Sequence, residues 1–145
     1  MTKTQDVNIR MVRVEDAKAT YSIAKEGIED GKGVSVVEEF NKDITKEEEW
    51  LKTYIDNPSK GIIFVADHQG EVAGFINCEI GNKFKTKHTA SFGVSVGRKC
   101  RGKGIGTALI LHLIEWCQSN QIEKLSLDVI GENTGAIKLY KKPWI

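Results

Sequence analysis

The sequence has little of what would mark it for a membrane, for secretion or for a polyanionic partner. Its formal net charge is only +1, from 21 basic and 20 acidic residues, so no bulk attraction for nucleic acid is expected. No apolar run reaches the length of a membrane span, and the N-terminus lacks a signal-peptide pattern. We therefore expect neither a nucleic-acid partner nor a membrane.

Cysteine is also scarce. The three cysteines, Cys78, Cys100 and Cys117, are odd in number and widely spaced, and no set of Cys, His and acidic residues has metal-ligand spacing. We expect reduced thiols, a cytoplasmic location and no metal. The composition, 40% hydrophobic and 28% charged, is that of an ordinary globular protein, and 145 residues suffice for a single domain with its own core.

Hydrophobic periodicity predicts a mixed α/β sheet with helices on both sides. We expect the first helix to open at Glu15 and Asp16 and to bury Ala17, Tyr21, Ala24 and Ile28. Thr45 and Glu48 have the spacing of a capping box for the second helix, and Gln69-Gly70 has the composition of a hairpin turn. The predicted strands cover residues 7–14, 61–66, 71–80, 90–96 and 124–130, and the later helices cover 105–118 and 133–142. The run at 61–66 is continuously apolar, as expected of a strand covered on both faces. The helix at 105–118 is expected to have five residues on one side, Ile105, Leu109, Leu113, Trp116 and Cys117.

A glycine-rich, basic loop separates the strand at 90–96 from the long helix that follows it. It reads Arg101-Gly102-Lys103-Gly104-Ile105-Gly106. Unpaired N–H groups and the positive end of the helix dipole favour an anion at such a place, and glycines allow a ligand to approach the backbone closely. The loop therefore predicts a phosphate-bearing ligand, although a basic turn without a ligand has the same composition.

Two common phosphate loops do not fit. A nucleotide P-loop starting at Gly97 would need Ser or Thr where Gly104 stands, and a dinucleotide fingerprint starting at Gly102 would need Gly or Ala at Thr107. Arg-x-x-Gly-x-Gly, starting five residues beyond Val96, does fit. It resembles the coenzyme A pyrophosphate loop of the GCN5-related N-acetyltransferase (GNAT) superfamily.

A second segment resembles the same superfamily. Asn133 through Tyr140 follows its Asn-x-x-Ala-x-x-Leu-Tyr pattern. On a helix the two named residues would share a face roughly 10 Å apart along the axis, the span of an extended pantetheine arm. The alternatives are a plain N-cap for Asn133 and a core aromatic for Tyr140.

The resemblance implies an acyl-CoA N-acyltransferase-like fold with acetyl-CoA as the acetyl donor. It assigns residues 1–60 to acceptor-side helices and 61–142 to the CoA-binding core. Asn133 would bond a pantetheine amide, and Tyr140 would face the sulfur as the catalytic acid. The backbone of Val94, Ser95 and Val96 would pair with pantetheine, and the pyrophosphate would be held by Arg101, Gly102, Lys103, Gly104, Ile105, Gly106 and Thr107.

The sequence departs from the family pattern in two places. Arg98 stands where the family often has proline. The sequence also ends at Lys142-Pro143-Trp144-Ile145, where the family normally has Gly-Phe and a final β-hairpin. Without that hairpin the strand at 124–130 would be an open edge. We expect oligomerisation, such as a homodimer, or a rearranged helix to compensate.

The leading function is acetyl transfer to a primary amine of a small molecule or a protein. A non-catalytic acyl-CoA-binding module and a different phosphate-ligand enzyme are the alternatives. Glu79, His88 and the Glu38-Glu39 pair are candidate general bases, each with a surface or structural role as the simpler interpretation. His68 and His112 are expected at the surface, and Cys100 has no identifiable base partner.

Overall fold

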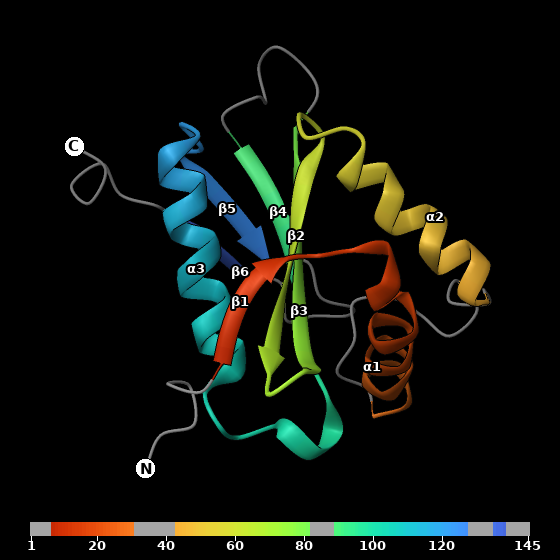
Figure 1. Ribbon diagram of the computed structural model, residues 1–145. Coiled ribbons are helices and arrows are strands. Elements are labelled where there is room, and N and C mark those ends of the chain that lie inside the picture. The colour runs from red at the N-terminus through yellow and green to blue at the C-terminus, as the bar shows by residue number, and fades with distance from the viewer. Residues whose placement is uncertain (1–6, 31–42, 82–88, 128–134, 139–145) are drawn as a thin grey trace.

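The computed structural model describes residues 7–30, 43–81, 89–127 and 135–138. Its six strands form one sheet in the order β1-β2-β3-β4-β5-β6, in which only β4 and β5 are parallel neighbours. This confirms the predicted mixed α/β class (Figure 1). The elements are β1 (Val7–Met11), the 3-10 helix η2 (Val14–Asp16), α1 (Ala17–Glu29), α2 (Ile44–Ile55), β2 (Gly61–His68), β3 (Glu71–Ile80), β4 (Thr89–Val96), the 3-10 helix η5 (Arg98–Cys100), α3 (Ile105–Ser119), β5 (Lys124–Leu127) and β6 (Gly135–Lys138).

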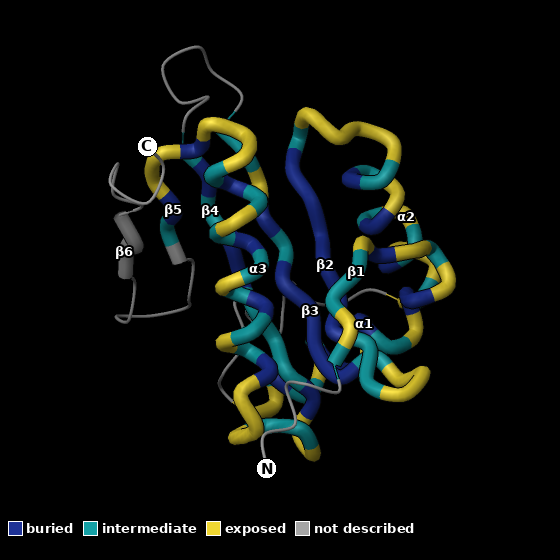
Figure 2. The backbone as a smooth tube through the Cα atoms, turned by 60° about the vertical axis from the view of Figure 1, so that its left-hand side comes forward, coloured by how far each residue is buried: buried dark blue, intermediate teal, exposed yellow. Residues whose placement is uncertain are grey.

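The sheet separates two hydrophobic cores. Helix α3 covers one face and helices α1 and α2 cover the other (Figure 1). Alternate residues of β2 divide between them, with Ile62 and Phe64 toward α3 and Ile63 and Val65 toward α1 and α2. The central strands are therefore buried on both faces, as the dark tube of β2 in Figure 2 shows and as the apolar run of this strand predicted.

Helix α3 anchors the larger core. Every fourth residue from its start is buried, which places one continuous ridge against the sheet. That ridge is Ile105, Leu109, Leu113 and Cys117, four of the five residues that the periodicity placed on one side. The fifth, Trp116, is partly buried beside them. The predicted helix is confirmed, and its first two residues, Ile105 and Gly106, are the last two of the glycine-rich segment.

The β2–β3 hairpin has the predicted turn. Gln69 and Gly70 both have positive φ, +55° and +92°, which is the conformation of a two-residue hairpin whose twist matches its strands. The Asp67 carboxylate accepts a hydrogen bond from the Gly70 N–H at 2.9 Å. The register is thereby fixed at His68 opposite Glu71.

The first helix buries Ala17 as predicted, but the rest of its buried face is shifted by one position. Thr20, Ile23 and Gly27 are buried, whereas the predicted Tyr21, Ala24 and Ile28 are half-buried. A polar residue at the centre of the face explains the error. Thr20 donates a hydrogen bond from Oγ1 to the Glu47 Oε2 atom of α2 at 2.7 Å, so its hydroxyl is satisfied in the interior.

The capping box predicted for the second helix is also wrong. The N-cap of α2 is Asp43, whose side chain accepts a hydrogen bond from the Lys46 N–H at 3.0 Å. Because Asp43 already bonds the third residue of the helix, Thr45 lies inside the first turn rather than before it.

The helix predicted over 133–142 is wrong for the part that the structure describes. Gly135–Lys138 form strand β6, which pairs antiparallel with β5, Leu125 opposite Ile137. This pairing gives the backbone N–H and C=O groups of β5 hydrogen-bond partners along the edge that was expected to be open. The periodicity of residues 133–142 could not predict it, because the partner strand lies elsewhere in the sequence. The predicted open edge at β5 is therefore wrong as well, while Asn133 and Tyr140 lie outside the described residues.

Candidate functional site

Strand β4 has two different halves. Its first half pairs in parallel with β5, from Thr89 opposite Lys124 to Phe92 opposite Leu127. Its second half continues for four more residues, which pair with β3 on the other side. Val94, Ser95 and Val96, predicted to pair with an added ligand, all lie in this second half and are half-buried. Within the described residues the β5-facing edge there carries no strand, which is the geometry that strand addition requires.

The loop after β4 reaches α3 through two left-handed glycines. Gly102 has φ +79° and Gly104 has φ +82°, a region that side chains with a Cβ rarely adopt. A Cβ added at Gly102 would meet nothing within 4 Å, so this glycine is required by backbone conformation rather than by crowding. Gly102, Lys103, Gly104 and Thr107 are all exposed, as a ligand-binding loop must be.

The start of α3 has no side-chain cap in the described structure. Its N-cap is Gly104, whose carbonyl accepts the first helical hydrogen bond from the Ala108 N–H at 3.0 Å. The N–H groups of Ile105, Gly106 and Thr107 precede that bond, and the helix dipole adds positive potential there. The Ile105 side chain is buried in the core, so only its backbone can serve a ligand. This helix end suits an anion.

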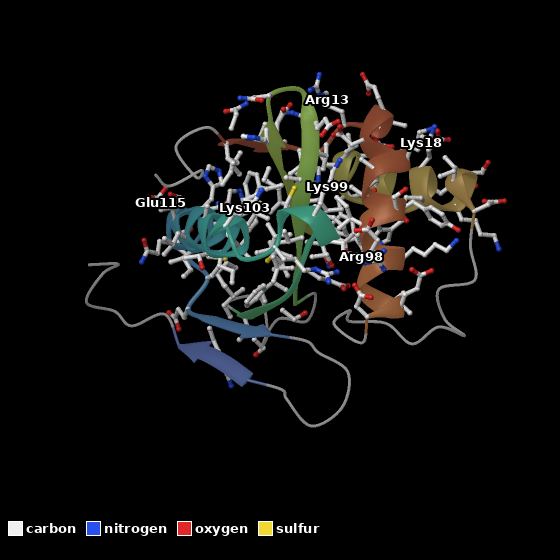
Figure 3. The ribbon with its side chains drawn as sticks, turned by 90° about the horizontal axis from the view of Figure 1, so that it is seen from below. Arg13, Lys18, Arg98, Lys99, Lys103 and Glu115 are labelled. Carbon is white, nitrogen blue, oxygen red and sulfur yellow. The ribbon has the colours of Figure 1, made fainter. Side chains whose placement is uncertain are left out.

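The two arginines of the loop point at helix α1. Arg101 places Nη1 2.7 Å from the Asp30 Oδ2 atom, and its Nε donates to the Val96 carbonyl at 3.2 Å. Arg98 places Nε 3.0 Å from the same Asp30 oxygen and Nη2 3.2 Å from Glu29. Figure 3, viewed from below, shows Arg98 beside α1 and Lys103 by the start of α3. Arg98, the departure from the family's proline, thus has a defined partner.

Sequence reasoning missed the acidic last turn of α1. Glu26, Glu29 and Asp30 gather where the helix dipole is negative, with no basic residue in that turn. This unfavourable arrangement was a signal that a cation must approach from elsewhere. In the structure the Glu26 Oε1 atom accepts a hydrogen bond from the backbone N–H of Arg98 at 2.7 Å. Side-chain hydrogen bonds from Arg98, which has the larger effect, and from Arg101 lower the pKa of Asp30 to about 2.

A cavity of about 360 Å³ opens at the other end of β4, on the sheet face that α1 and α2 partly cover. Glu79, Ser91 and Ser126 lie across three adjacent strands in register, and all line it. Glu79 is the acidic residue among its lining residues, which also include Ile80, Gly81, Thr89, Ala90 and Lys124. The Glu79 carboxylate is 54% exposed and lies 3.4 Å from the Lys60 ammonium. Of the predicted candidate bases, Glu79 is within the described residues, and His88, Glu38 and Glu39 lie outside them.

Three other residues considered from sequence are placed away from this cavity. His112 is not a simple surface residue, because it packs edge-on against Phe64 with ring centroids 4.6 Å apart. His68 is half-buried rather than fully exposed, and its Nδ1 atom has no hydrogen-bond partner among the described residues. Cys100 is partly buried against the α3 core. None of the three lines the cavity beside Glu79.

Within the described ranges no group of His, Cys, Asp and Glu is arranged to hold a metal ion. The helices described there are also too short or too polar to cross a bilayer.

The sheet order, the parallel β4–β5 pair and the glycine-rich loop before α3 define an acyl-CoA N-acyltransferase-like fold. Solved structures share it: an N-acetyltransferase from Staphylococcus aureus Mu50 superposes with a TM-score of 0.76 at 23% identity, covering 88% of this chain and 75% of that one. A GNAT superfamily phosphinothricin acetyltransferase from Sinorhizobium meliloti, in complex with acetyl-CoA, gives 0.70 at 20% identity, with coverage of 84% and 65%.

The model of the acetyltransferase (GNAT) family matches residues 32–144. The chain therefore belongs to the GNAT acetyltransferase family, as the two sequence motifs predicted. Among curated relatives, the L-amino acid N-acetyltransferase AaaT of Escherichia coli K12 is 30% identical over 95 residues, 64% of this chain and 57% of that protein. An uncharacterized N-acetyltransferase of Methanocaldococcus jannaschii is 32% identical over 109 residues, 71% of this chain and 48% of that protein. The chain thus spans about half the length of these relatives.

Proposed function

We propose that this protein transfers an acetyl group from acetyl-CoA to a primary amine of a small molecule or a protein. The observation that carries the proposal is that the second half of β4, which has no described strand on its β5 side, leads through the glycine-rich loop to a helix start without a side-chain cap among the described residues. The strand edge suits an extended arm that carries amides, and the helix start suits a pyrophosphate. Membership of the GNAT family supports the same conclusion.

The cofactor would be held mainly by backbone. Peptide groups of Val94 and Ser95 would pair with pantetheine, while the Val96 carbonyl already accepts a hydrogen bond from Arg101. N–H groups from Gly102 to Thr107 would face the pyrophosphate. Asn133 would bond a pantetheine amide. In this division residues 61–142 form the cofactor-binding core, and residues 1–60 face the acceptor.

The amine must lose a proton before it can attack. An alkyl ammonium with a pKa of about 10.4 costs about 4–5 kcal/mol to neutralise at pH 7. Glu79 is placed to attract the ammonium and to accept its proton, directly or through water, because its exposed carboxylate lines the cavity beside β4. We therefore assign it the role of general base.

Acetyl-CoA supplies the activated thioester when it is bound. The oxyanion formed on attack needs a backbone N–H donor, which the end of β4 at Val94 and Ser95 can provide. The departing thiolate, with a parent pKa of about 8.5, would be protonated by the Tyr140 hydroxyl. Holding both substrates at neighbouring places supplies much of the remaining acceleration.

The acceptor is proposed only as a class. The E. coli relative is named an L-amino acid N-acetyltransferase, so free amino acids belong in the first set of amines to test. Peptides with a free N-terminus and simple alkyl amines complete the set. The mixed charge of the cavity, with Glu79 and Lys124 both in its lining, is compatible with an acceptor that carries an ammonium and a carboxylate.

Calorimetry with acetyl-CoA, free CoA and ATP, followed by release of free thiol over the amine set, tests the proposal. Both CoA forms should bind and ATP should bind more weakly. Gly104→Glu should abolish CoA binding, because it places a carboxylate and a disfavoured left-handed side chain at the helix start. Tyr140→Phe should bind CoA normally and turn over slowly. CoA binding without turnover of any amine would identify a non-catalytic binding module, and preferred binding of ATP would overturn the proposal.

A further inference from the structure

The loop before α3 carries four cations that are not equivalent. Arg98 and Arg101 are both engaged by Asp30, at 3.0 and 2.7 Å, and Arg98 also by Glu29. Lys99 and Lys103 are exposed and have no ion pair within the described residues. Two cations are therefore neutralised by helix α1, and two face solvent with their charge available.

Arg101 also bridges two elements. Its Nε donates to the carbonyl of Val96, the last residue of β4, while its Nη1 meets Asp30 at the end of α1. A guanidinium can bond to both elements at once because its nitrogens point in different directions from one rigid, flat group. Arg98 adds a backbone contact, since its N–H donates to Glu26 at 2.7 Å. The strand end and the loop are thus tied to the acidic turn of α1 at several points.

We infer that Asp30 is a positioning residue which, through Arg98 and Arg101, sets the shape of the phosphate loop, and that Lys99 and Lys103 meet the cofactor's phosphate charge. This deepens the proposed function and rests on it. A direct phosphate role for the Arg101 side chain, expected from the motif alone, is replaced by a structural one. An arginine already paired with a carboxylate offers little net charge to an approaching anion, whereas an exposed lysine offers all of it.

A bridging role and a direct charge role for Arg101 predict different effects of replacing it by lysine. Arg101→Lys keeps the positive charge but replaces the rigid guanidinium, whose separate nitrogens meet Val96 and Asp30, by one nitrogen on a flexible chain. If Arg101 acts by bridging, Arg101→Lys should weaken CoA binding as much as Arg101→Gln. If Arg101 acts by charge on the phosphates, Arg101→Lys should retain most of the affinity. Asp30→Glu, which preserves the carboxylate, should bind CoA better than Asp30→Asn.

The experiment combines CoA calorimetry at low and high salt with urea unfolding of the free protein. Lys99→Gln and Lys103→Gln should each weaken CoA binding by roughly 10- to 100-fold, the range for losing a bond to a charged group, and should flatten its salt dependence. Their urea midpoints should match the wild type. Asp30→Asn and Arg101→Gln should lower the urea midpoint, and the double variant should be no worse than the poorer single variant in unfolding or in CoA affinity.

Four results would overturn the inference. The first is an Arg101→Lys variant that retains most of the CoA affinity, and the second is tighter CoA binding by Asp30→Asn, which would mean that Asp30 withholds Arg101 from the phosphates. The others are additive losses in the double variant and lysine variants with wild-type affinity and salt dependence. In each of these the wild type still binds CoA, so the proposed function survives. A wild-type protein that binds no CoA would overturn both.

Discussion

Thr20 on α1 and Glu47 on α2 form a buried hydrogen bond of 2.7 Å between Oγ1 and Oε2. Thr20 is fully buried and Glu47 is 1% exposed, so the pair joins the two helices inside the smaller core. Thr20→Val keeps the shape of the side chain but removes the donor to a buried carboxylate. We expect it to lower the free energy of unfolding by about 1–3 kcal/mol in urea titrations, and Thr20→Ser to recover part of the loss. A Thr20→Val protein as stable as wild type would show that water replaces the hydroxyl.

Leu109 and Leu111 provide a matched pair on α3. Leu109 is completely buried in the larger core, whereas Leu111 is 58% exposed. Leu109→Ala should destabilise the protein by about 2–5 kcal/mol, from lost burial and the cavity left behind. Leu111→Ala should stay within about 0.5 kcal/mol of wild type. Similar losses for the two variants in chemical denaturation would contradict the orientation of α3 on the sheet.

The pairing of Asp30 predicts a particular acid sensitivity. Hydrogen bonds from Arg98 and Arg101 lower its folded-state pKa from the usual 3.8 to about 2. A carboxylate with a lowered pKa contributes stability above its unfolded pKa and loses that contribution as pH falls through the folded value. The stability difference between wild type and Asp30→Asn should thus be constant above about pH 5 and shrink between about pH 4 and 2. Unfolding titrations over this range measure it, and a difference independent of pH would contradict the pairing.

The sequence predicted the elements whose signals are local. The apolar ridge from Ile105, the hairpin turn at Gln69-Gly70 and the loop motif at Arg101 each depend on neighbouring residues, and the structure has each element where its pattern placed it. The position of strand β4 before the loop was equally predictable.

The features that the sequence did not predict share a non-local cause. Arg101 meets a carboxylate 71 positions away, and Arg98 meets the same group 68 positions away, so both contacts depend on how α1 docks. Strand β6 depends on the edge of β5, and the buried face of α1 depends on Glu47 across the helix pair. The hydrophobic periodicity of one segment carries no information about partners that lie elsewhere in the chain. The acidic end of α1 was the one local sign that a partner was missing.

Glu79→Gln tests the proposed base. It removes proton acceptance while preserving size, so kcat/KM for amines should fall by about 10²- to 10⁴-fold near neutral pH. The loss should shrink at high pH, where more of the amine is already neutral. CoA affinity should be unchanged, because Glu79 lies at the opposite end of β4 from the loop. Glu71→Gln, a change of the same kind at the exposed hairpin turn, is the matched control. Equal rates for Glu79→Gln and wild type at every pH would exclude Glu79 as the base.

Two glycines next to Val96 should respond differently to alanine. A Cβ at Gly74 would lie 2.8 Å from the Ser95 carbonyl oxygen and 3.3 Å from the Val96 Cα, so backbone would have to move. We expect Gly74→Ala to destabilise the protein and to weaken CoA binding, because the displaced residues belong to the half of β4 that has no described strand on its β5 side. At Gly106 the nearest atom is the Val96 Cγ2 at 3.5 Å, an ordinary contact, and alanine favours a helix by up to about 1 kcal/mol over glycine. Gly106→Ala should therefore be as stable as wild type or more so. A stable Gly74→Ala protein that binds CoA normally would show that the β4 edge has room to shift and that the close β3–β4 approach is not needed for the cofactor.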